Sequence, residues 1–121
     1  MPEPRRDLVE RTYVFAQAVR RFVNELPVTL SNREDSRQLV RSSGSVAANY
    51  LEAQEGLSRN DFFFRIKISR KEARESWLWL RLLSTGTSSE LEAARQLLTN
   101  EADELVRIFS SIAKKIEIEA E

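Results

Sequence analysis

Apolar side chains recur at intervals of three and four residues along most of the chain, which places them on one side of an α-helix. Four long helices are expected, at about residues 6–26, 32–56, 59–84 and 89–117. No run alternates apolar and polar residues as a half-buried strand would. Only a few residues separate consecutive helices, so neighbours must run in opposite directions. The sequence predicts an all-α fold: an antiparallel, up-down-up-down four-helix bundle in a single domain of residues 1–121.

Residues that start or stop helices lie near the expected boundaries. Ser31 and Glu34 have the spacing of a capping box at the start of the second helix. Ser58 is suited to cap the third helix, directly after Gly56 has ended the second. Gly86 is expected to stop the third helix. These signals support the four predicted segments.

The composition removes most catalytic chemistry. The 121 residues include no histidine and no cysteine. Thiolate nucleophiles, disulfides and the imidazole base of most hydrolase triads are therefore excluded. Glu72 and Glu75 have a spacing that is routine on helix surfaces, where carboxylates meet Arg or Lys one turn away. We predict that the protein is not an enzyme, with no catalytic residue, cofactor or metal.

Charges balance over the whole chain but not along it. Nineteen Lys and Arg face nineteen Asp and Glu, so no net field draws the protein to nucleic acid or membrane. Residues 33–81 have a basic excess and residues 82–121 an acidic one, which favours ion pairing between helices. No stretch approaches the roughly 18 apolar residues of a membrane span, and the N-terminus lacks the apolar core of a signal peptide. We expect a cytoplasmic protein without membrane association.

The predicted third helix is apolar on two sides. At 100° per residue, one side supplies the stripe that a bundle core needs. The side at about 200–260° carries four further large apolar side chains, Phe64, Ile68, Trp79 and Leu82. A helix that is unusually buried in its own bundle would explain them, and so would a contact with another subunit. We prefer a subunit interface, because large exposed apolar patches usually mark one.

The predicted second helix has a flank of small polar residues. Ser42, Ser45 and Asn49 line up beside its apolar side, and small side chains let another helix approach closely. Because the apolar positions keep their helical phase across Gly44, we expect one continuous helix rather than two short ones. The flank is expected to form a tight helix–helix contact, within or between chains, and we include its three residues in the subunit interface.

Basic residues share one sector of the third helix. They are Lys67, Arg70, Lys71, Arg74 and Arg81. One hypothesis is a stripe that binds the phosphates of RNA or another nucleic acid. The other is a solvated face balanced by Glu101, Asp103 and Glu104, and this second hypothesis is preferred because the net charge is zero.

Several stretches resemble a known bacterial family. They are ERTYVFA at residues 10–16, RSSGSVAANYLEA at 41–53, SRNDF at 58–62 and KEARES at 71–76. The chain resembles the four-helix bundle family named for proteins encoded within intervening sequences of 23S ribosomal RNA genes. The match extends over about the whole domain.

The resemblance implies an antiparallel four-helix bundle that assembles into a homopentamer and has no established enzymatic activity. It also implies kinship with the accessory protein of diversity-generating retroelements, a basic pentamer that works with a reverse transcriptase and RNA. It makes Arg41, Ser43, Ser45, Asn49, Glu52 and Asp61 packing or subunit-contact residues. The leading hypothesis is a self-assembling interaction scaffold whose partner is itself. The alternative is an RNA-binding accessory protein that uses the basic stripe.

Overall fold

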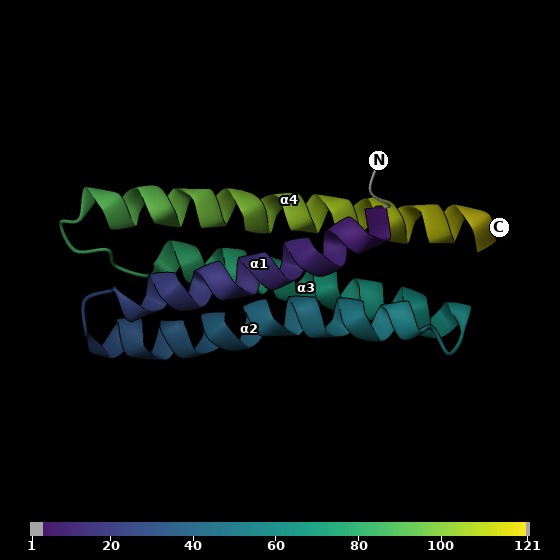
Figure 1. Cartoon of the computed structure of the whole chain (residues 1–121), viewed down its shortest axis with the longest axis horizontal. Coiled ribbons are helices and arrows are strands. Elements are labelled where there is room, and N and C mark those ends of the chain that lie inside the picture. Colours follow the sequence, from purple (N-terminus) through teal and green to yellow (C-terminus); the bar gives the residue numbers. More distant parts are fainter. Residues whose placement is uncertain (1–3, 121) are drawn as a thin grey trace.

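The computed structural model describes the backbone of residues 4–120 and the side-chain surroundings of residues 8–120. The helices are α1 (Pro4–Asn24), α2 (Leu30–Glu55), α3 (Arg59–Leu82) and α4 (Ser89–Ala120), and the described residues include no strand. Each helix runs opposite to the one before it (Figure 1). The predicted all-α, antiparallel four-helix bundle is confirmed.

The helix starts are only partly as expected. The capping box predicted at Ser31 is wrong, because α2 begins at Leu30, two residues before the predicted start. Its cap is Thr29, whose Oγ1 accepts a hydrogen bond from the Asn32 N–H at 3.1 Å. The cap predicted at Ser58 is confirmed, since its Oγ accepts from the Asp61 N–H at 3.0 Å.

The helix ends differ from the prediction at α1, α3 and α4, and α1 ends at Asn24 rather than at about residue 26. Gly56 ends α2 as predicted, with a left-handed φ of 42° that glycine adopts without strain. By contrast, α3 ends at Leu82, and Gly86 lies in the following loop with a φ of 65°. The fourth helix continues past residue 117 to Ala120.

The core is formed by the inward sides of all four helices. The largest fully buried side chains include Tyr50, Phe15 and Phe109, and the rings of Tyr50 and Phe109 lie 5.8 Å apart. Helix α3 packs along both α2 and α4, whereas α1 packs mainly on α2. Figure 1 shows α1 tilted across the bundle, near α4 at its first residues and near α2 at its last.

One end of the bundle is fastened by a single buried side chain. The Asn32 amide donates to the carbonyls of Pro27, at 3.0 Å, and Ser84, at 2.9 Å. Its Oδ1 accepts from the Ser84 N–H at 2.9 Å. Asn32 thus joins the α1–α2 and α3–α4 connections, which lie together at the left end in Figure 1.

Helix α2 is continuous through Gly44, as predicted. A Cβ at this position would lie 3.2 Å from the Nη2 of Arg20. The Arg20 guanidinium crosses from α1 and donates to the carbonyls of Ala16, at 2.9 Å, and Val40, at 3.4 Å. The absence of a side chain at Gly44 therefore gives an arginine of α1 room to lie against α2.

No helix in the described part of the chain combines the length and apolar character that crossing a lipid bilayer requires.

Candidate subunit interface on helix α3

Large apolar side chains are exposed on the side of α3 that faces away from the bundle. Phe64 is 54% exposed and Leu82 is 55% exposed, and Leu78 is also exposed between them. These positions lie within about 40° of each other on the helix. We call them, with the neighbouring cations Lys67, Lys71 and Arg74, the outer face of α3. Leu78 is not part of the predicted interface, because its helical angle of about 160° lies outside the predicted side at about 200–260°.

The other two side chains of the predicted apolar face are partly covered by their own chain. Ile68 and Trp79 are half-buried, and Trp79 packs against the core. Both lie next to the side of α3 that packs on α2, where Glu72 and Ser76 are buried. The Nε1 of Trp79 is buried and has no hydrogen-bond partner. The predicted four-residue face therefore divides into an exposed pair and a half-buried pair.

Ser42 lies inside the chain's own bundle. It is 0% exposed, and its Oγ lies 2.8 Å from the Oγ of Ser76 on α3. The prediction that Ser42 contacts another subunit is wrong, because α3 of the same chain covers it.

Asn49 takes part in the same contact between α2 and α3. Its Oδ1 accepts a hydrogen bond from Nη1 of Arg65 on α3 at 3.1 Å, and its amide donates to the Ser45 carbonyl and Oγ, both at 3.0 Å. Ser45 and Asn49 remain half-buried. The small-residue flank of α2 therefore forms a contact within the chain, which was one of the two alternatives.

The carboxylates Glu72 and Glu75 belong to ion pairs between α2 and α3. Nη1 of Arg41 lies 2.9 Å from Glu72, and Nη2 lies 3.2 Å from Glu75. Lys71 lies 3.8 Å from Glu75 and 3.9 Å from Glu72. Because Glu72 is almost completely buried, it needs these cations for compensation. The expectation that this carboxylate pair meets Arg and Lys is confirmed, but its placement on the helix surface is wrong for Glu72, which is 4% exposed and pairs with an arginine of α2.

The basic stripe consists of side chains with different surroundings. The Lys67 amine lies 4.4 Å from the centre of the Phe63 ring, and the Arg81 guanidinium lies 4.5 Å from that of Trp77. No ion pair joins Arg70 or Arg74 to another described residue. The structure thus places two of the five cations over aromatic rings.

The carboxylates predicted to balance this stripe have other partners. Glu101 accepts two hydrogen bonds of 2.8 Å from Arg11 on α1. Asp103 pairs with Arg107 within α4 at 3.2 Å. The predicted pairing of Glu101 and Asp103 with the basic stripe is wrong, because their side chains turn to α1 and along α4.

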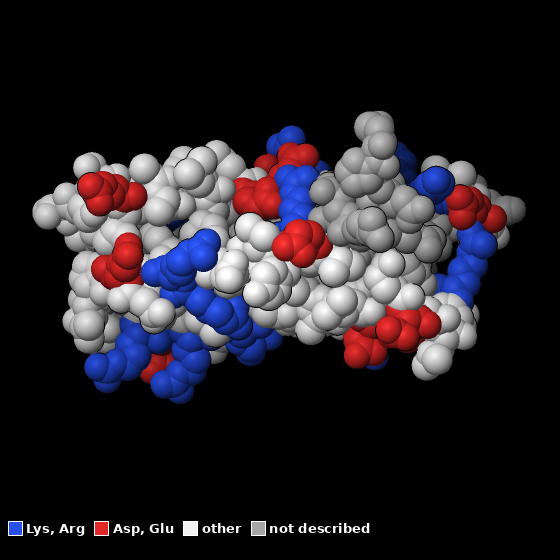
Figure 2. Space-filling model, in the orientation of Figure 1, with Lys and Arg blue, Asp and Glu red and all other residues white. Residues whose placement is uncertain are grey.

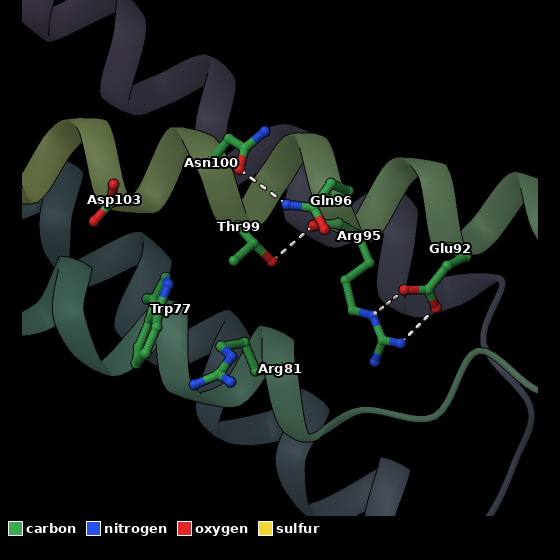
Figure 3. A pocket seen from close by; sticks show the side chains of 8 residues that line it. All are labelled: Trp77, Arg81, Glu92, Arg95, Gln96, Thr99, Asn100 and Asp103. Atoms are coloured by element: carbon green, nitrogen blue, oxygen red, sulfur yellow. Dashed lines mark hydrogen bonds and ion pairs between the residues drawn. The ribbon is translucent and has the colours of Figure 1, made fainter.

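A shallow groove of about 470 Å³ lies between α3 and α4 (Figure 3). Its lining is Trp77, Arg81, Glu92, Arg95, Gln96, Thr99, Asn100 and Asp103. Most of the polar side chains on its α4 wall bind one another or the backbone: Gln96 donates to Asn100 at 3.0 Å, and Thr99 donates to the Arg95 carbonyl at 2.8 Å. The described residues include no cluster of acidic side chains that could hold a metal ion.

Glu92 is held at the rim of this groove by Arg95 and Thr85. Arg95 donates to both of its carboxylate oxygens, and Thr85 Oγ1 donates to Oε2 at 2.9 Å. The hydrogen bond from Arg95, followed by that from Thr85, lowers the pKa of Glu92 below its ordinary value. The carboxylate therefore remains ionised and bound, as expected of a structural contact.

Four antiparallel helices around one core define a helical-bundle protein. The chain belongs to the family of 23S rRNA-intervening sequence proteins, whose model matches residues 6–111. The predicted family is confirmed. A crystal structure of a protein of unknown function from the S23 ribosomal protein family of Bacteroides thetaiotaomicron is similar, with a TM-score of 0.72 and 28% identity. The match covers 88% of this chain and 98% of that one. No curated protein matches the chain.

Proposed function

We propose that this protein is a non-enzymatic, cytoplasmic helical bundle that associates with further copies of itself and acts as an interaction scaffold. The observation that carries the proposal is the outer face of α3, where Phe64 and Leu82 are each more than half exposed. They lie 18 positions apart, or about 27 Å along the helix. A helix side of that length that combines exposed apolar side chains with charged ones is typical of a subunit contact.

The resemblance to the rRNA-intervening sequence family supports a closed ring, and a homopentamer is the assembly that we propose. A stable contact takes about 800 Å² from each partner, and the exposed surface of one chain is 7759 Å². About a tenth of the surface would therefore be needed on each side of a subunit contact.

Light scattering tests this proposal on the full chain. We expect the wild type to form particles several times heavier than the 14.0 kDa chain at micromolar concentration. The double variant Phe64→Asp, Leu82→Asp should be monomeric, because a buried unpaired carboxylate is costly at an apolar contact. Leu97→Asp is the matched control, since Leu97 on α4 is even more exposed, and its assembly should be unchanged. Trp79 is unsuitable for the test because it packs on the core.

Two results would contradict the proposal. One is a wild type that stays at the mass of a single chain. The other is a Phe64→Asp, Leu82→Asp variant that assembles like the wild type. Circular dichroism of each variant shows whether the bundle has kept its helical content.

A second proposed function is RNA binding by Lys67, Arg70, Lys71, Arg74 and Arg81. The observation that favours it is the placement of Lys67 over Phe63 and of Arg81 over Trp77. Proteins that bind single-stranded nucleic acid place cations beside aromatic rings, and bases stack on those rings. In this role the partners would be RNA and a reverse transcriptase, as the proposed kinship with the retroelement accessory protein would imply.

Fluorescence anisotropy with a labelled single-stranded RNA tests this second function. Affinity should fall steeply as salt rises, because counterions are released at each phosphate contact. Reversing Lys67, Arg74 and Arg81 to Glu should abolish binding. The control reverses three cations of α4, Arg107, Lys114 and Lys115. It changes the net charge by the same amount and should leave most of the RNA binding intact. Absence of binding at low salt would contradict RNA binding.

A further inference from the structure

A second surface combines exposed apolar side chains with charges opposite to those of α3. It lies at the C-terminal end of α2, and we call it the acidic end of α2. Leu51 is 52% exposed there, with Ala48, Glu52 and Glu55 exposed beside it and Leu57 exposed in the loop that follows. Figure 2 shows acidic side chains gathered at the lower right, where Figure 1 places this end of α2.

The charges of this surface have no partner within the described part of the chain. No ion pair joins Glu52 or Glu55 to another described residue. The same holds for Lys67 and Arg74 on the outer face of α3, although Lys67 lies over Phe63. Unpaired carboxylates next to an exposed leucine therefore complement unpaired cations next to Phe64 and Leu78.

A symmetric contact between two α3 helices is disfavoured by the same charges. Helix α3 carries seven basic and three acidic residues, and Glu75 on its flank is already paired with Arg41 and Lys71. Two copies of its outer face would bring like charges together, which costs affinity at an interface. The acidic end of α2 supplies the opposite charge, and its small Ala48 allows a helix to approach closely.

The positions of the two surfaces determine what kind of assembly they can build. Helices α2 and α3 are neighbours in the bundle, so their outward sides differ by about 90°. A contact between two different surfaces repeats from copy to copy. With neighbouring sides in contact, each copy turns by a similar angle, and the assembly closes after about four or five copies. If the two contacting surfaces lay on opposite sides of the bundle, the copies would instead add in a line and form an open filament.

We infer that the subunits associate head to tail, with the outer face of α3 in one copy bound to the acidic end of α2 in the next. This inference rests on the proposed self-association and names the surface that receives α3. Lys67 and Arg74 face Glu52 and Glu55 across the contact, while Phe64, one turn from Lys67, packs near Leu51.

Mixing two variants tests the inference. The α3 variant is Phe64→Asp with Leu82→Asp, and the α2 variant is Leu51→Lys with Glu55→Lys. A head-to-tail contact predicts that each variant alone is a monomer, because each has lost one of the two surfaces. Their equimolar mixture should form a dimer and nothing larger, since one intact junction remains and both outer ends are blocked.

The matched control places the same substitutions at the other end of α2. Leu30→Lys with Glu34→Lys introduces the same charges at an exposed leucine and glutamate, and this variant should assemble like the wild type. An α2 variant that assembles like the wild type would overturn the inference, as would a mixture that stays monomeric. A monomeric wild type would overturn the proposed self-association itself, so the two failures are distinguishable.

Charge reversal gives an independent test of the pairing. Lys67→Glu with Arg74→Glu should weaken association at least about tenfold, and Glu52→Lys with Glu55→Lys should do the same. A chain that carries all four reversals should recover most of the wild-type affinity, because each junction again joins opposite charges. Failure of the combined variant to recover would overturn the pairing of these two surfaces.

Discussion

At the scale of single residues, Gly44 inside α2 and Gly56 directly after it differ in whether the backbone needs a glycine. Gly44 is inside α2, where its backbone is helical, and a Cβ would meet only the end of the flexible Arg20 side chain. Gly56 follows α2 with a positive φ of 42°, which other residues adopt only with strain. The same substitution should therefore change stability in opposite directions at these two positions.

We predict that Gly44→Ala raises the free energy of unfolding by about 0.5–1 kcal/mol, because alanine is the better helix former and Arg20 can shift slightly. Gly56→Ala should lower it by about 1–2 kcal/mol through backbone strain. Urea denaturation of both variants measures the two changes. A destabilised Gly44→Ala variant would show that the Arg20 contact outweighs helix propensity.

The lowered pKa of Glu92 predicts a pH dependence of stability. Because the folded pKa lies below that of the unfolded chain, the contribution is present above the unfolded pKa and is lost as the pH falls through the folded pKa. Glu92→Gln should therefore lose less stability than the wild type between neutral pH and about pH 3. Thermal unfolding at several pH values measures this, with the exposed Glu90→Gln as control. Identical pH profiles for wild type and Glu92→Gln would contradict the role of Arg95 and Thr85.

Local sequence signals identify some capping residues and miss others for a physical reason. Ser58 was predicted because its hydroxyl is followed by the first turn of a helix, and it does accept the Asp61 N–H. At the start of α2, Thr29 and Ser31 are both suitable caps. Thr29 is the cap in the structure, where the following Asn32 is tied to Pro27 and Ser84. Contacts with residues distant in sequence are invisible in a local pattern.

At the scale of elements, the connection between the two loops at one end depends on Asn32. We predict that Asn32→Ala lowers the free energy of unfolding by about 1–3 kcal/mol, since it leaves the Ser84 N–H and two carbonyls without their partner. Asn24→Ala, at an exposed position near the end of α1, is the control and should change stability little. Equal denaturation midpoints for the two variants would contradict this prediction.

The number and order of helices can be predicted from the sequence. Which side chains of a helix are buried by the neighbouring helices cannot. The helical angle places Phe64, Ile68, Trp79 and Leu82 on one broad side of α3. Which of these are covered depends on how closely the neighbouring helices approach that side: Trp79 packs against the core, whereas Phe64 is exposed. That distance depends on the small Ser42 and Ser76, which lie in direct contact. Periodicity alone contains no such information.

At the scale of the whole molecule, ion pairs between helices were the least predictable feature. Arg11 and Glu101 are separated by 90 positions, and their pairing requires the register of α1 against α4. The charge excess of the middle segment suggested instead that α4 would balance α3. One ion pair of this kind forms, between Arg59 of α3 and Glu119 of α4 at 2.6 Å. Glu101 of α4, however, pairs with Arg11 of α1, which leaves Lys67 and Arg74 of α3 available for another partner.

The unequal packing of α1 has a consequence for how the molecule opens. Helix α3 is held by neighbours on both sides, whereas α1 has α2 on one side and meets α4 over a short stretch near Arg11 and Glu101. Amide hydrogen exchange should therefore be faster in the second half of α1 than in the middle of α3. Equal protection of the two helices would contradict this. If α1 detaches first, α2 and α3, which form the proposed ring contact, remain folded. A brief local opening of one subunit therefore need not break its contacts with the neighbouring subunits.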